Sequence, residues 1–310
     1  MRTPRALARL TARGPAALIA IAFAGCVEQI DNGSAWLPMS EMTGALVPEL
    51  GPMPAARSAP GCTLRIATWN VHFGADADDL ADQIDSSTEI ARADVLMIQE
   101  VEAYPTESAT RTRRLAERLG MTWVYAPARV EGAGTHGIAT LSRYPLEDTA
   151  VRRLPHSDQV LNPRERNALA TTVVIGGDRL QIVNLHLDVR MGAVDRVRQL
   201  HPAVNEIDER VVVGGDFNSN PWAWSAGIVP LVHTQAIVGQ DQASVLDDYL
   251  LGKGFTSAIS VDTGTMRIPG VSIRIDNLYP RGLPLTAAGV EYVDGSDHWP
   301  LWMDVDRCQN

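Results

Sequence analysis

Short apolar runs with the length of β-strands recur from Thr63 to the end of the chain, and they restrict the fold more than any other feature. The run TLRIATWNV alternates as a half-buried strand does, and DVLMIQEV is a short apolar run typical of a buried strand. Helical spacing appears between such runs, in DDLADQIDSSTEIARA and in RTRRLAERLG, which Gly120 would end. Mixed strands with helices between them predict a layered α/β domain with helices outside the sheets.

The remaining strands and helices follow the same pattern. Further strands are predicted at MTWVYAP, GIATLSRY, DTAVRRL, ALATTVVIG, LQIVNLHL, RVVVGGDF, IRIDNLYP, LTAAGVEYV and PLWMDV. Further helices are predicted around Val194 to Ile207, near Trp222 and at Val245 to Leu251. No internal repeat or second linker interrupts this series, so one domain is the simplest account.

The N-terminus has the order of a secretory signal. Four arginines precede an apolar run from Pro15 to Gly25, and this run is too short to span a membrane, which takes roughly 20 residues. Residues 1–25 are therefore predicted to be removed. The segment FAGC, which ends at Cys26, resembles a bacterial lipobox whose cysteine carries lipid; an ordinary signal peptide cut nearby is the alternative. Residues 26–61, rich in Pro, Gly and Ser, predict a tether, and 62–310 the domain.

The mature chain is strongly acidic. Loss of residues 1–25 would leave 23 basic against 37 acidic residues, a net charge of −14. Such a protein is repelled by polyanions at long range, and tight sequence-reading of DNA depends on neutralising phosphates. The charge therefore argues against a sequence-specific DNA-binding protein.

Polar side chains stand at the ends of several predicted strands, where packing gives them no evident role. They are Asn70, Glu100, His186, Asp188, Asp216, Asn218, Asp276, Asp297 and His298. Each alone has an ordinary alternative, such as a turn former, a helix cap or a satisfied core histidine. Together they supply carboxylates for a hard cation, a base for water and donors for developing charge, as phosphate ester hydrolysis requires. The sequence has neither a cysteine-rich zinc spacing nor a GxSxG esterase motif.

Seven segments strengthen this interpretation through a resemblance. TWNVH, IQEV, GIATLSRYPL, NLHLD, GGDFNSNP, RIDNL and SDHWPL resemble, in order and rough spacing, the motifs of the endonuclease/exonuclease/phosphatase superfamily. The resemblance covers about residues 63–306. It implies a four-layered α/β sandwich, with two mixed, mostly antiparallel β-sheets packed face to face and helices outside. It also implies a metal-dependent phosphoric ester hydrolase, as in deoxyribonuclease I and the bacterial sphingomyelinases.

The resemblance implies a metal site. Glu100 matches the family's principal metal ligand, assisted by Asn70 and Asp297. The expected cofactor is Mg²⁺, with Mn²⁺ or Ca²⁺ as alternatives. Where some nucleases of the family have an aspartate two residues after the motif asparagine, this chain has His72.

The resemblance also implies catalytic roles. Asp216 matches the aspartate that orients or deprotonates the attacking water, and Asn218 the asparagine that hydrogen-bonds the scissile phosphate. His186 matches the histidine that contacts a phosphate oxygen. His298 matches the histidine that binds or protonates the phosphate, with Asp276 holding its other ring nitrogen, a pairing that favours the imidazolium.

Two arginines are weaker candidates for phosphate binding. Arg143 and Arg166 lie in family-like segments that often present a cation to the phosphate, but a surface salt bridge is equally compatible with either. The surrounding residues 152–198 carry more arginines than acids. This local excess of positive charge would collect an anionic substrate, or it is an ordinary solvated face.

The cysteines also bear on topology. With Cys26 lipidated, Cys62 and Cys308 remain as an even pair in an oxidising compartment. In the family, the first and last strands are antiparallel neighbours, which implies a Cys62–Cys308 disulfide; two free thiols are the alternative.

Three functions stay open at this level. The first is a phosphodiesterase or nuclease that acts on a nucleic acid or a small phosphodiester. It is expected to be a monomer and to act outside the cytoplasm. It would be held on a membrane by N-terminal lipid, or else secreted. The second is a lipid or inositol phosphate phosphoesterase, favoured by the tether and the acidic charge. The third, a catalytically inactive surface binding module, would be expected to have lost some of Glu100, Asp216, Asp297 or His298, all of which are present.

Overall fold

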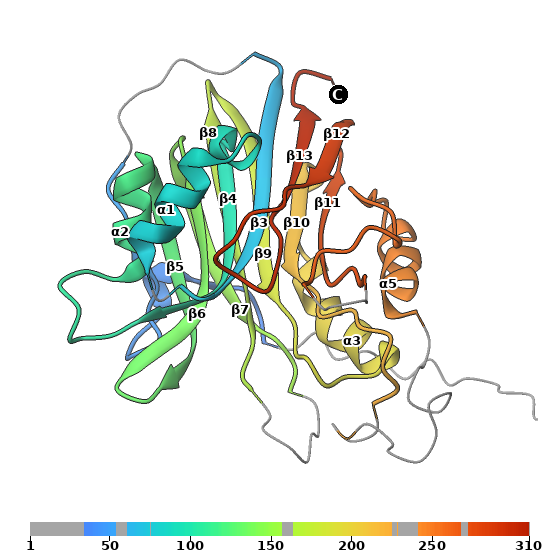
Figure 1. The fold of residues 1–310 in the computed structure, drawn as a ribbon, viewed down its shortest axis with the longest axis horizontal. Helices are drawn as coiled ribbons and strands as arrows, with labels where there is room; N and C mark the ends of the chain where they lie inside the picture. Colours follow the sequence, from blue (N-terminus) through green and yellow to red (C-terminus); the bar gives the residue numbers. More distant parts are fainter. Residues whose placement is uncertain are drawn as a thin grey trace, which may run out of the picture. The chain divides into compact units, whose positions relative to one another are not determined.

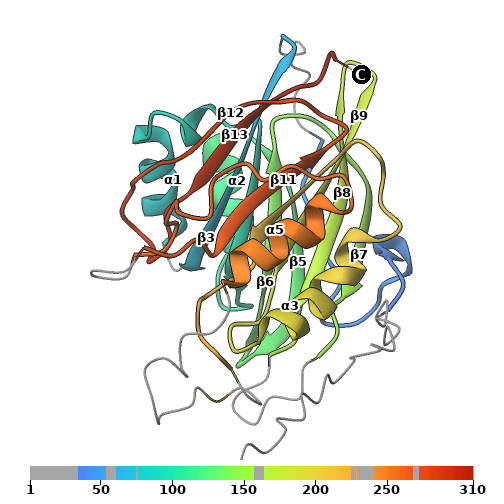
Figure 2. The same ribbon diagram turned by 90° about the vertical axis from the view of Figure 1, so that its right-hand side faces the viewer.

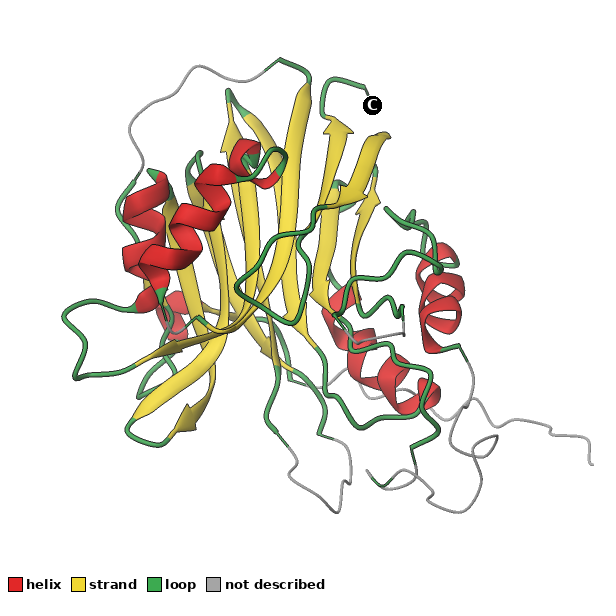
Figure 3. Cartoon of the chain, viewed as in Figure 1, coloured by secondary structure: helices red, strands yellow, loops and turns green. Residues whose placement is uncertain are grey.

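Two β-sheets lie face to face, and helices cover the outer face of each (Figure 1, Figure 3). The computed structural model describes residues 34–53, 61–74, 76–156, 164–224, 228, 241–267 and 272–309. Both sheets are mixed and mostly antiparallel, with β3 parallel to β4 and β9 parallel to β10. The expected four-layered α/β sandwich is confirmed.

The first sheet has six strands and the second has seven. The six-stranded sheet has the order β1 (Leu37–Pro38), β7 (Leu146–Arg153), β8 (Asn167–Ile175), β9 (Asp178–His186), β10 (Val211–Asp216), β11 (Asp276–Arg281). The seven-stranded sheet has the order β12 (Leu285–Val290), β13 (Leu301–Asp306), β3 (Thr63–Phe73), β4 (Val95–Ala103), β6 (Gly134–Ser142), β5 (Thr122–Glu131), β2 (Glu49–Leu50). The helices are α1 (Ala77–Ser86), α2 (Arg111–Leu119), α3 (Ala193–Leu200) and α5 (Gln242–Leu251), with 3-10 turns η1 (Met39–Glu41), η2 (Ile90–Arg92) and η3 (His201–Val204).

The main hydrophobic core fills the space between the sheets. Ile66 and Met97 reach it from the seven-stranded sheet, and Val212 and Leu278 reach it from the six-stranded sheet, all without exposed surface. Each such side chain stabilises the fold by about 1.5–3 kcal/mol. Two further cores lie under the helices, one below α1 and α2 and one below α3 and α5. Figure 2 shows α3 and α5 lying over the six-stranded sheet.

The helix predicted over DDLADQIDSSTEIARA is split into α1 and η2. α1 begins after Asp76, whose carboxylate accepts the N–H groups of the first turn, and ends at Ser86. The following N–H groups of residues 88–90 donate to the carboxylate of Glu291, which lies far away in sequence. A tertiary contact has thus taken donors that a continuous helix would have used.

The N-terminal segment differs from the tether expected for residues 26–61. Residues 34–53 pack on the domain: β1 pairs with β7, and β2 pairs with β5, so each adds an edge strand to a different sheet. Trp36 packs against the third core, and the Arg152 guanidinium lies 4.9 Å from its ring centroid. The packed domain therefore includes Ser34. Residues 1–33, with the predicted signal and Cys26, lie outside the described residues.

A disulfide links two neighbouring strands, the first and the last of the domain's long strands, at one end of the seven-stranded sheet. Cys62 precedes β3 and Cys308 follows β13, and these strands pair antiparallel with Thr63 opposite Asp306. The pairing brings the two Cα atoms to 5.1 Å, within the range of disulfides, and the Cys62–Cys308 bond is present. The bridge therefore holds β3, which carries Asn70, next to β13, which follows Asp297.

We expect reduction of this disulfide to lower the free energy of unfolding by up to about 5 kcal/mol, because the bridge closes a loop of 246 residues. Urea unfolding of oxidised and reduced protein, followed by circular dichroism, measures the difference. The double variant Cys62→Ser, Cys308→Ser is the control, since reductant should leave its stability unchanged. Equal stability of the oxidised and reduced wild type, or a peptide map without the linkage, would contradict the expectation.

Candidate active site

Three ionisable side chains lie in one row at the edge of the six-stranded sheet. β9 ends at His186, β10 ends at Asp216 and β11 begins at Asp276, and the strand register pairs Asp216 with both of the others. Parallel β9 and β10 end at the same edge, where antiparallel β11 starts. All three side chains are buried.

Two glycines before Asp216 allow this close approach. A Cβ on Gly214 would lie 2.4 Å from Leu278 Cδ2, and one on Gly215 would lie 1.9 Å from Leu185 O. Gly215 also has φ +136°, which residues with side chains rarely adopt. The two glycines of VVVGGD are therefore required to bring Asp216 between β9 and β11.

The Asp216 carboxylate is the centre of a hydrogen-bond network. Asn70 Nδ2 donates to its Oδ2 at 2.9 Å. Asn218 donates to Oδ1 through its backbone N–H at 2.8 Å and to Oδ2 through its amide at 3.3 Å. Burial raises the pKa of Asp216 to about 7, although the charge of His298 opposes the shift. A carboxylate with this pKa is suited to accept a proton near neutral pH.

Asp276 holds His298 toward the same carboxylate. His298 Nδ1 lies 2.9 Å from Asp276 Oδ2, which leaves Nε2 facing Asp216 Oδ2 at 3.9 Å. Burial lowers the pKa of His298, but Asp276 and Asp216 outweigh burial and raise it to about 10. The ring is therefore a cationic donor. Its backbone is fixed by Trp69 Nε1, which donates to its carbonyl, and by Ser296 Oγ, which accepts its N–H.

Arg166 fixes the other histidine of the group. Its Nη1 lies 2.8 Å from His186 Nδ1 and 3.1 Å from His186 Nε2. His186 Nε2 also lies 3.3 Å from Asp216 Oδ2 and 3.8 Å from Glu100 Oε1. Burial and the charge of Arg166 lower the pKa of His186 well below its ordinary value, so the ring is neutral. The structure thus brings Arg166 into the group, buried behind His186.

A β-bulge presents Glu100 from the seven-stranded sheet. The pairing of β4 with β6 shifts between Gln99 and Val101, and Glu100 has φ +58°. This left-handed conformation is strained in a residue other than glycine and tends to occur at functional sites. The side chain is 17% exposed, so Glu100 connects the buried group with solvent.

Asp297 lies beside Asn70 at the end of β3. Ser296 Oγ donates to the Asn70 carbonyl at 2.7 Å, and the Asp297 carboxylate lies 3.3 Å from His72 Nδ1. The Asn70 amide oxygen accepts the His72 N–H at 3.1 Å. Asn70 therefore has Asp216 on one side and the His72–Asp297 pair on the other.

The oxygen donors of this group fit a hard divalent cation. The group contains the carboxylates of Glu100, Asp216, Asp276 and Asp297. These carboxylates attract a divalent cation, although the His298 imidazolium offsets part of their charge. Carboxylate and amide oxygens are the ligands that Mg²⁺ and Mn²⁺ prefer. The residues present are therefore compatible with the expected metal.

Arg143 lies elsewhere. Its Nε and Nη2 donate to the carbonyls of Ala93 and Ala91, just before β4 begins. Glu100 is near the other end of that strand. Arg143 therefore stabilises the loop before β4. The structure does not place it with Glu100 and Asp216, so its predicted phosphate-binding role has no support from its position.

Arg196 supports the site, although no sequence motif singled it out. It lies on α3, is fully buried, and donates a hydrogen bond to Gln242 Oε1. Its guanidinium also donates to the carbonyl oxygens of Asp188, Val189, Met191 and Phe217. These carbonyls lie in the loops after β9 and β10, so one side chain ties together the segments that follow His186 and Asp216. The available signal was an arginine on the buried face of the helix, beside Gln199 and Leu200.

Comparison with known proteins decides the family of the chain. The sequence profile of the Endonuclease/Exonuclease/phosphatase family matches residues 67–298. The chain belongs to this family. It is 25% identical over 268 residues to the uncharacterized protein YbhP of Escherichia coli (strain K12). This alignment covers 78% of the present chain and 96% of YbhP.

Solved structures of endonuclease/exonuclease/phosphatase proteins show the same fold. One from Beutenbergia cavernae DSM 12333 superimposes with a TM-score of 0.60 at 21% identity, over 79% of this chain and 71% of that one. The human Nocturnin catalytic domain with bound sulfate anion has a TM-score of 0.54 at 20% identity, over 78% of this chain and 93% of that one. The chain thus has the fold and the general phosphoesterase or nuclease activity of its family. The roles of individual residues stay predictions.

Proposed function

We propose that this protein is a divalent-metal-dependent hydrolase that cleaves phosphate esters by direct attack of water. One observation carries the proposal. Asp216, buried and raised in pKa, is held by Asn70 and Asn218 beside the His298 imidazolium. This arrangement places a proton acceptor and a cationic donor a few ångströms apart, as hydrolysis of a phosphate ester needs.

Glu100, Asn70 and Asp297 would hold the metal. When bound, a divalent cation polarises a phosphoryl oxygen and stabilises the charge that develops on it. Glu100 and Asp297 are the more exposed carboxylates of the group, with 17% and 43% of their side chains accessible. Asp216 is only 1% exposed. The accessible carboxylates therefore suit a ligand that also meets solvent and substrate, and the buried one suits proton transfer.

Asp216 accepts the proton of the attacking water. As the water oxygen bonds to phosphorus, its proton passes to the Asp216 carboxylate, and the bond from phosphorus to the leaving oxygen breaks. The leaving oxygen then takes a proton from solvent. The hydrogen bonds from Asn70 and Asn218 fix the direction of the carboxylate, so its geometry is set before the substrate arrives.

His298 and Asn218 stabilise the phosphate. With Nδ1 held by Asp276, His298 has Nε2–H free to donate to a phosphoryl oxygen. Asn218 Nδ2 donates to Leu187 O at 2.9 Å and more weakly to Asp216 at 3.3 Å. If Asn218 Nδ2 gives up its longer hydrogen bond to Asp216, it is able to donate to a phosphoryl oxygen of the substrate instead. Preorganised donors of this kind lower the barrier because they need not reorganise during the reaction.

Charge favours a compact substrate. A mature net charge of −14 opposes the approach of a long polyanion such as duplex DNA. A small phosphodiester or the phosphate ester of a lipid headgroup carries far less charge. We therefore place such compact esters ahead of nucleic acid polymers.

We expect Asp216→Asn and His298→Ala each to lower the kcat for bis-p-nitrophenyl phosphate by at least about 10², because both groups act mainly in the transition state. Release of p-nitrophenol measures the rate, and circular dichroism verifies folding. EDTA should abolish the wild-type activity, and Mg²⁺ or Mn²⁺ should restore it. Arg118→Gln, on the outer face of α2, is a control expected to stay near wild type. Activity that survives EDTA, or that is near wild type in either site variant, would refute the mechanism.

We also propose that the protein acts outside the cytoplasm, anchored through lipid on Cys26. The order of the first 25 residues and the lipobox-like FAGC support this location, as does the Cys62–Cys308 disulfide, since such bonds persist in oxidising compartments. None of the described helices is long and apolar enough to cross a membrane.

Intact-mass analysis of protein extracted from membranes should show a diacylated or triacylated cysteine at position 26, because two or three chains are needed for stable anchoring. Cys26→Ser should move the protein to the soluble fraction. Cys62→Ser is the control, since loss of that thiol should leave the protein with the membrane. An unmodified mature protein with its N-terminus elsewhere would count against lipid attachment.

A further inference from the structure

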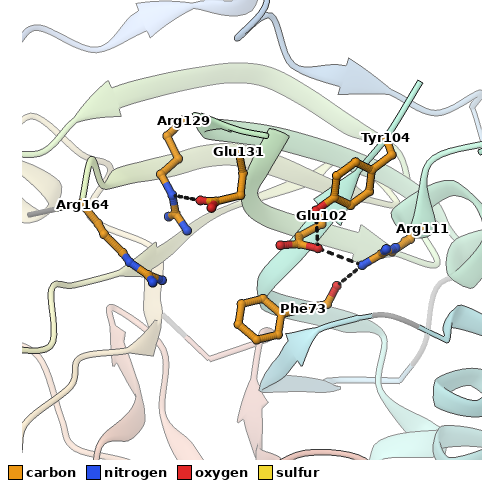
Figure 4. A pocket seen from close by; sticks show the side chains of 7 residues that line it. All are labelled: Phe73, Glu102, Tyr104, Arg111, Arg129, Glu131 and Arg164. Atoms are coloured by element: carbon orange, nitrogen blue, oxygen red, sulfur yellow. Dashed lines mark hydrogen bonds and ion pairs between the residues drawn. The ribbon is translucent and has the colours of Figure 1, made fainter. Parts of the chain in front are cut away.

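A pocket lies beside the candidate active site. It has a volume of about 390 Å³ and opens at the ends of β3, β4 and β5. Its lining consists of Phe73, Glu102, Tyr104, Arg111, Arg129, Glu131 and Arg164. Figure 4 shows Arg129, Glu131 and Arg164 on one side of this pocket and Glu102, Tyr104 and Arg111 on the other.

The two carboxylates of the pocket already have partners. Glu102 accepts hydrogen bonds from Arg111 at 3.1 Å and from the Tyr104 hydroxyl at 3.0 Å. Glu131 accepts one from Arg129 Nε at 2.7 Å. Both carboxylates of the pocket are therefore already paired with an arginine, and Arg111 is shared with Glu107.

Positive charge and donors are left over. Arg129 is only 7% exposed, and its buried Nη1 has no hydrogen-bond partner among the described residues. Arg164 makes no hydrogen bond or ion pair with the described part of the chain. A buried arginine N–H without an acceptor is unfavourable, because its desolvation is not compensated. An anion in the pocket would lie against the Arg129 guanidinium and match the charge of Arg164.

A buried histidine, His136, lies behind the pocket and senses its positive charge. His136 lies between Glu102 and Arg129 in the strand register, and neither of its buried ring nitrogens has a hydrogen-bond partner within the described ranges. Burial, followed by the charges of Arg129, Arg166 and Arg164, lowers the pKa of His136 well below its ordinary value. The charges of three arginines are thus felt at this buried ring.

The pocket and the active site use neighbouring residues of the same strands. Phe73 follows His72, which contacts Asp297, and Glu102 stands two residues after Glu100 on β4. A small cavity lined by His136, Arg166 and His186 lies between the strand ends of the two sheets. The pocket therefore adjoins the chain segments that carry His72 and Glu100.

We propose that this pocket binds a second phosphate group of the substrate, held by Arg129 and Arg164, while the ester to be cleaved lies at Glu100 and Asp216. This inference rests on the proposed function and narrows it to substrates with two phosphates on one small molecule. A phosphate monoester offers several acceptor oxygens and up to two negative charges, and arginine forks match its geometry.

Matched substrates test the proposal. One is thymidine 5′-(p-nitrophenyl phosphate), and the other is the same compound with an additional 3′-phosphate. An equivalent pair built on inositol, with and without a ring phosphate, distinguishes a nucleotide from a lipid-headgroup source. We expect wild type to cleave the doubly phosphorylated member of one pair with a kcat/KM at least about tenfold higher.

The preference is the ratio of the two kcat/KM values. Arg164→Gln should remove most of it, so that the ratio falls toward one. Arg129→Lys tests the buried partner, since it keeps the charge but loses the planar fork. Arg118→Gln removes the same charge from the outer face of α2 and should leave the ratio unchanged. Because Arg164 is partly exposed, its variant is expected to fold even if the Arg129 variant does not.

A binding measurement separates failure of this pocket from failure of the proposed hydrolysis. In EDTA, isothermal titration compares adenosine 3′,5′-bisphosphate with adenosine 5′-monophosphate. Tighter binding of the bisphosphate by wild type, lost in Arg164→Gln, supports the pocket even if no substrate is cleaved. The absence of cleavage would then refute the proposed hydrolase and not the pocket. Equal binding of both nucleotides, or equal cleavage within both substrate pairs, overturns the pocket proposal while leaving the hydrolase intact.

Discussion

Burial of the Asp216 carboxylate is the constraint on which the rest of the site depends. A charge removed from water is unfavourable unless hydrogen bonds and opposite charge replace its hydration. Asn70 and Asn218 supply the donors, and His298 supplies the charge. These groups come from both sheets, so the two sheets must be held in one relative position. The disulfide, the glycines of β10 and the carbonyl contacts of Arg196 all serve to hold the segments that meet at this carboxylate.

The strand ends of the site were predictable because they depend on local patterns. An apolar run that ends in Asp216, or a β-strand that ends in Asn70, is visible without any knowledge of tertiary structure, and these side chains do meet. Contacts over long sequence distances were not predictable. Glu291 splits a helix that its own sequence favours, and residues 34–53 add edge strands although their composition is that of a linker. Arg143 resembles a site residue by its segment, but its position in the fold gives it another role.

Strain and exposure divide the site into two parts. His186, Asp216 and Asp276 are buried and occupy regular strand positions, so packing fixes them before any ligand binds. Glu100 is partly exposed and lies in a strained left-handed conformation at a bulge, next to the pocket lined by Arg129. In the proposed mechanism, the buried groups carry out the proton transfer and the bulged edge contacts the ligands. The same bulge joins the cation-rich pocket to the carboxylates.

The claim that these carboxylates hold a divalent cation is tested most directly by anomalous diffraction from crystals soaked in Mn²⁺. The structure predicts one strong anomalous peak about 2.0–2.6 Å from a carboxylate oxygen of Glu100, on the side of Asn70 and Asp297. Glu100→Gln should weaken or remove the peak. A wild-type crystal with no peak at this position under saturating Mn²⁺, or with its strongest peak at a site that lacks Glu100, would contradict the claim.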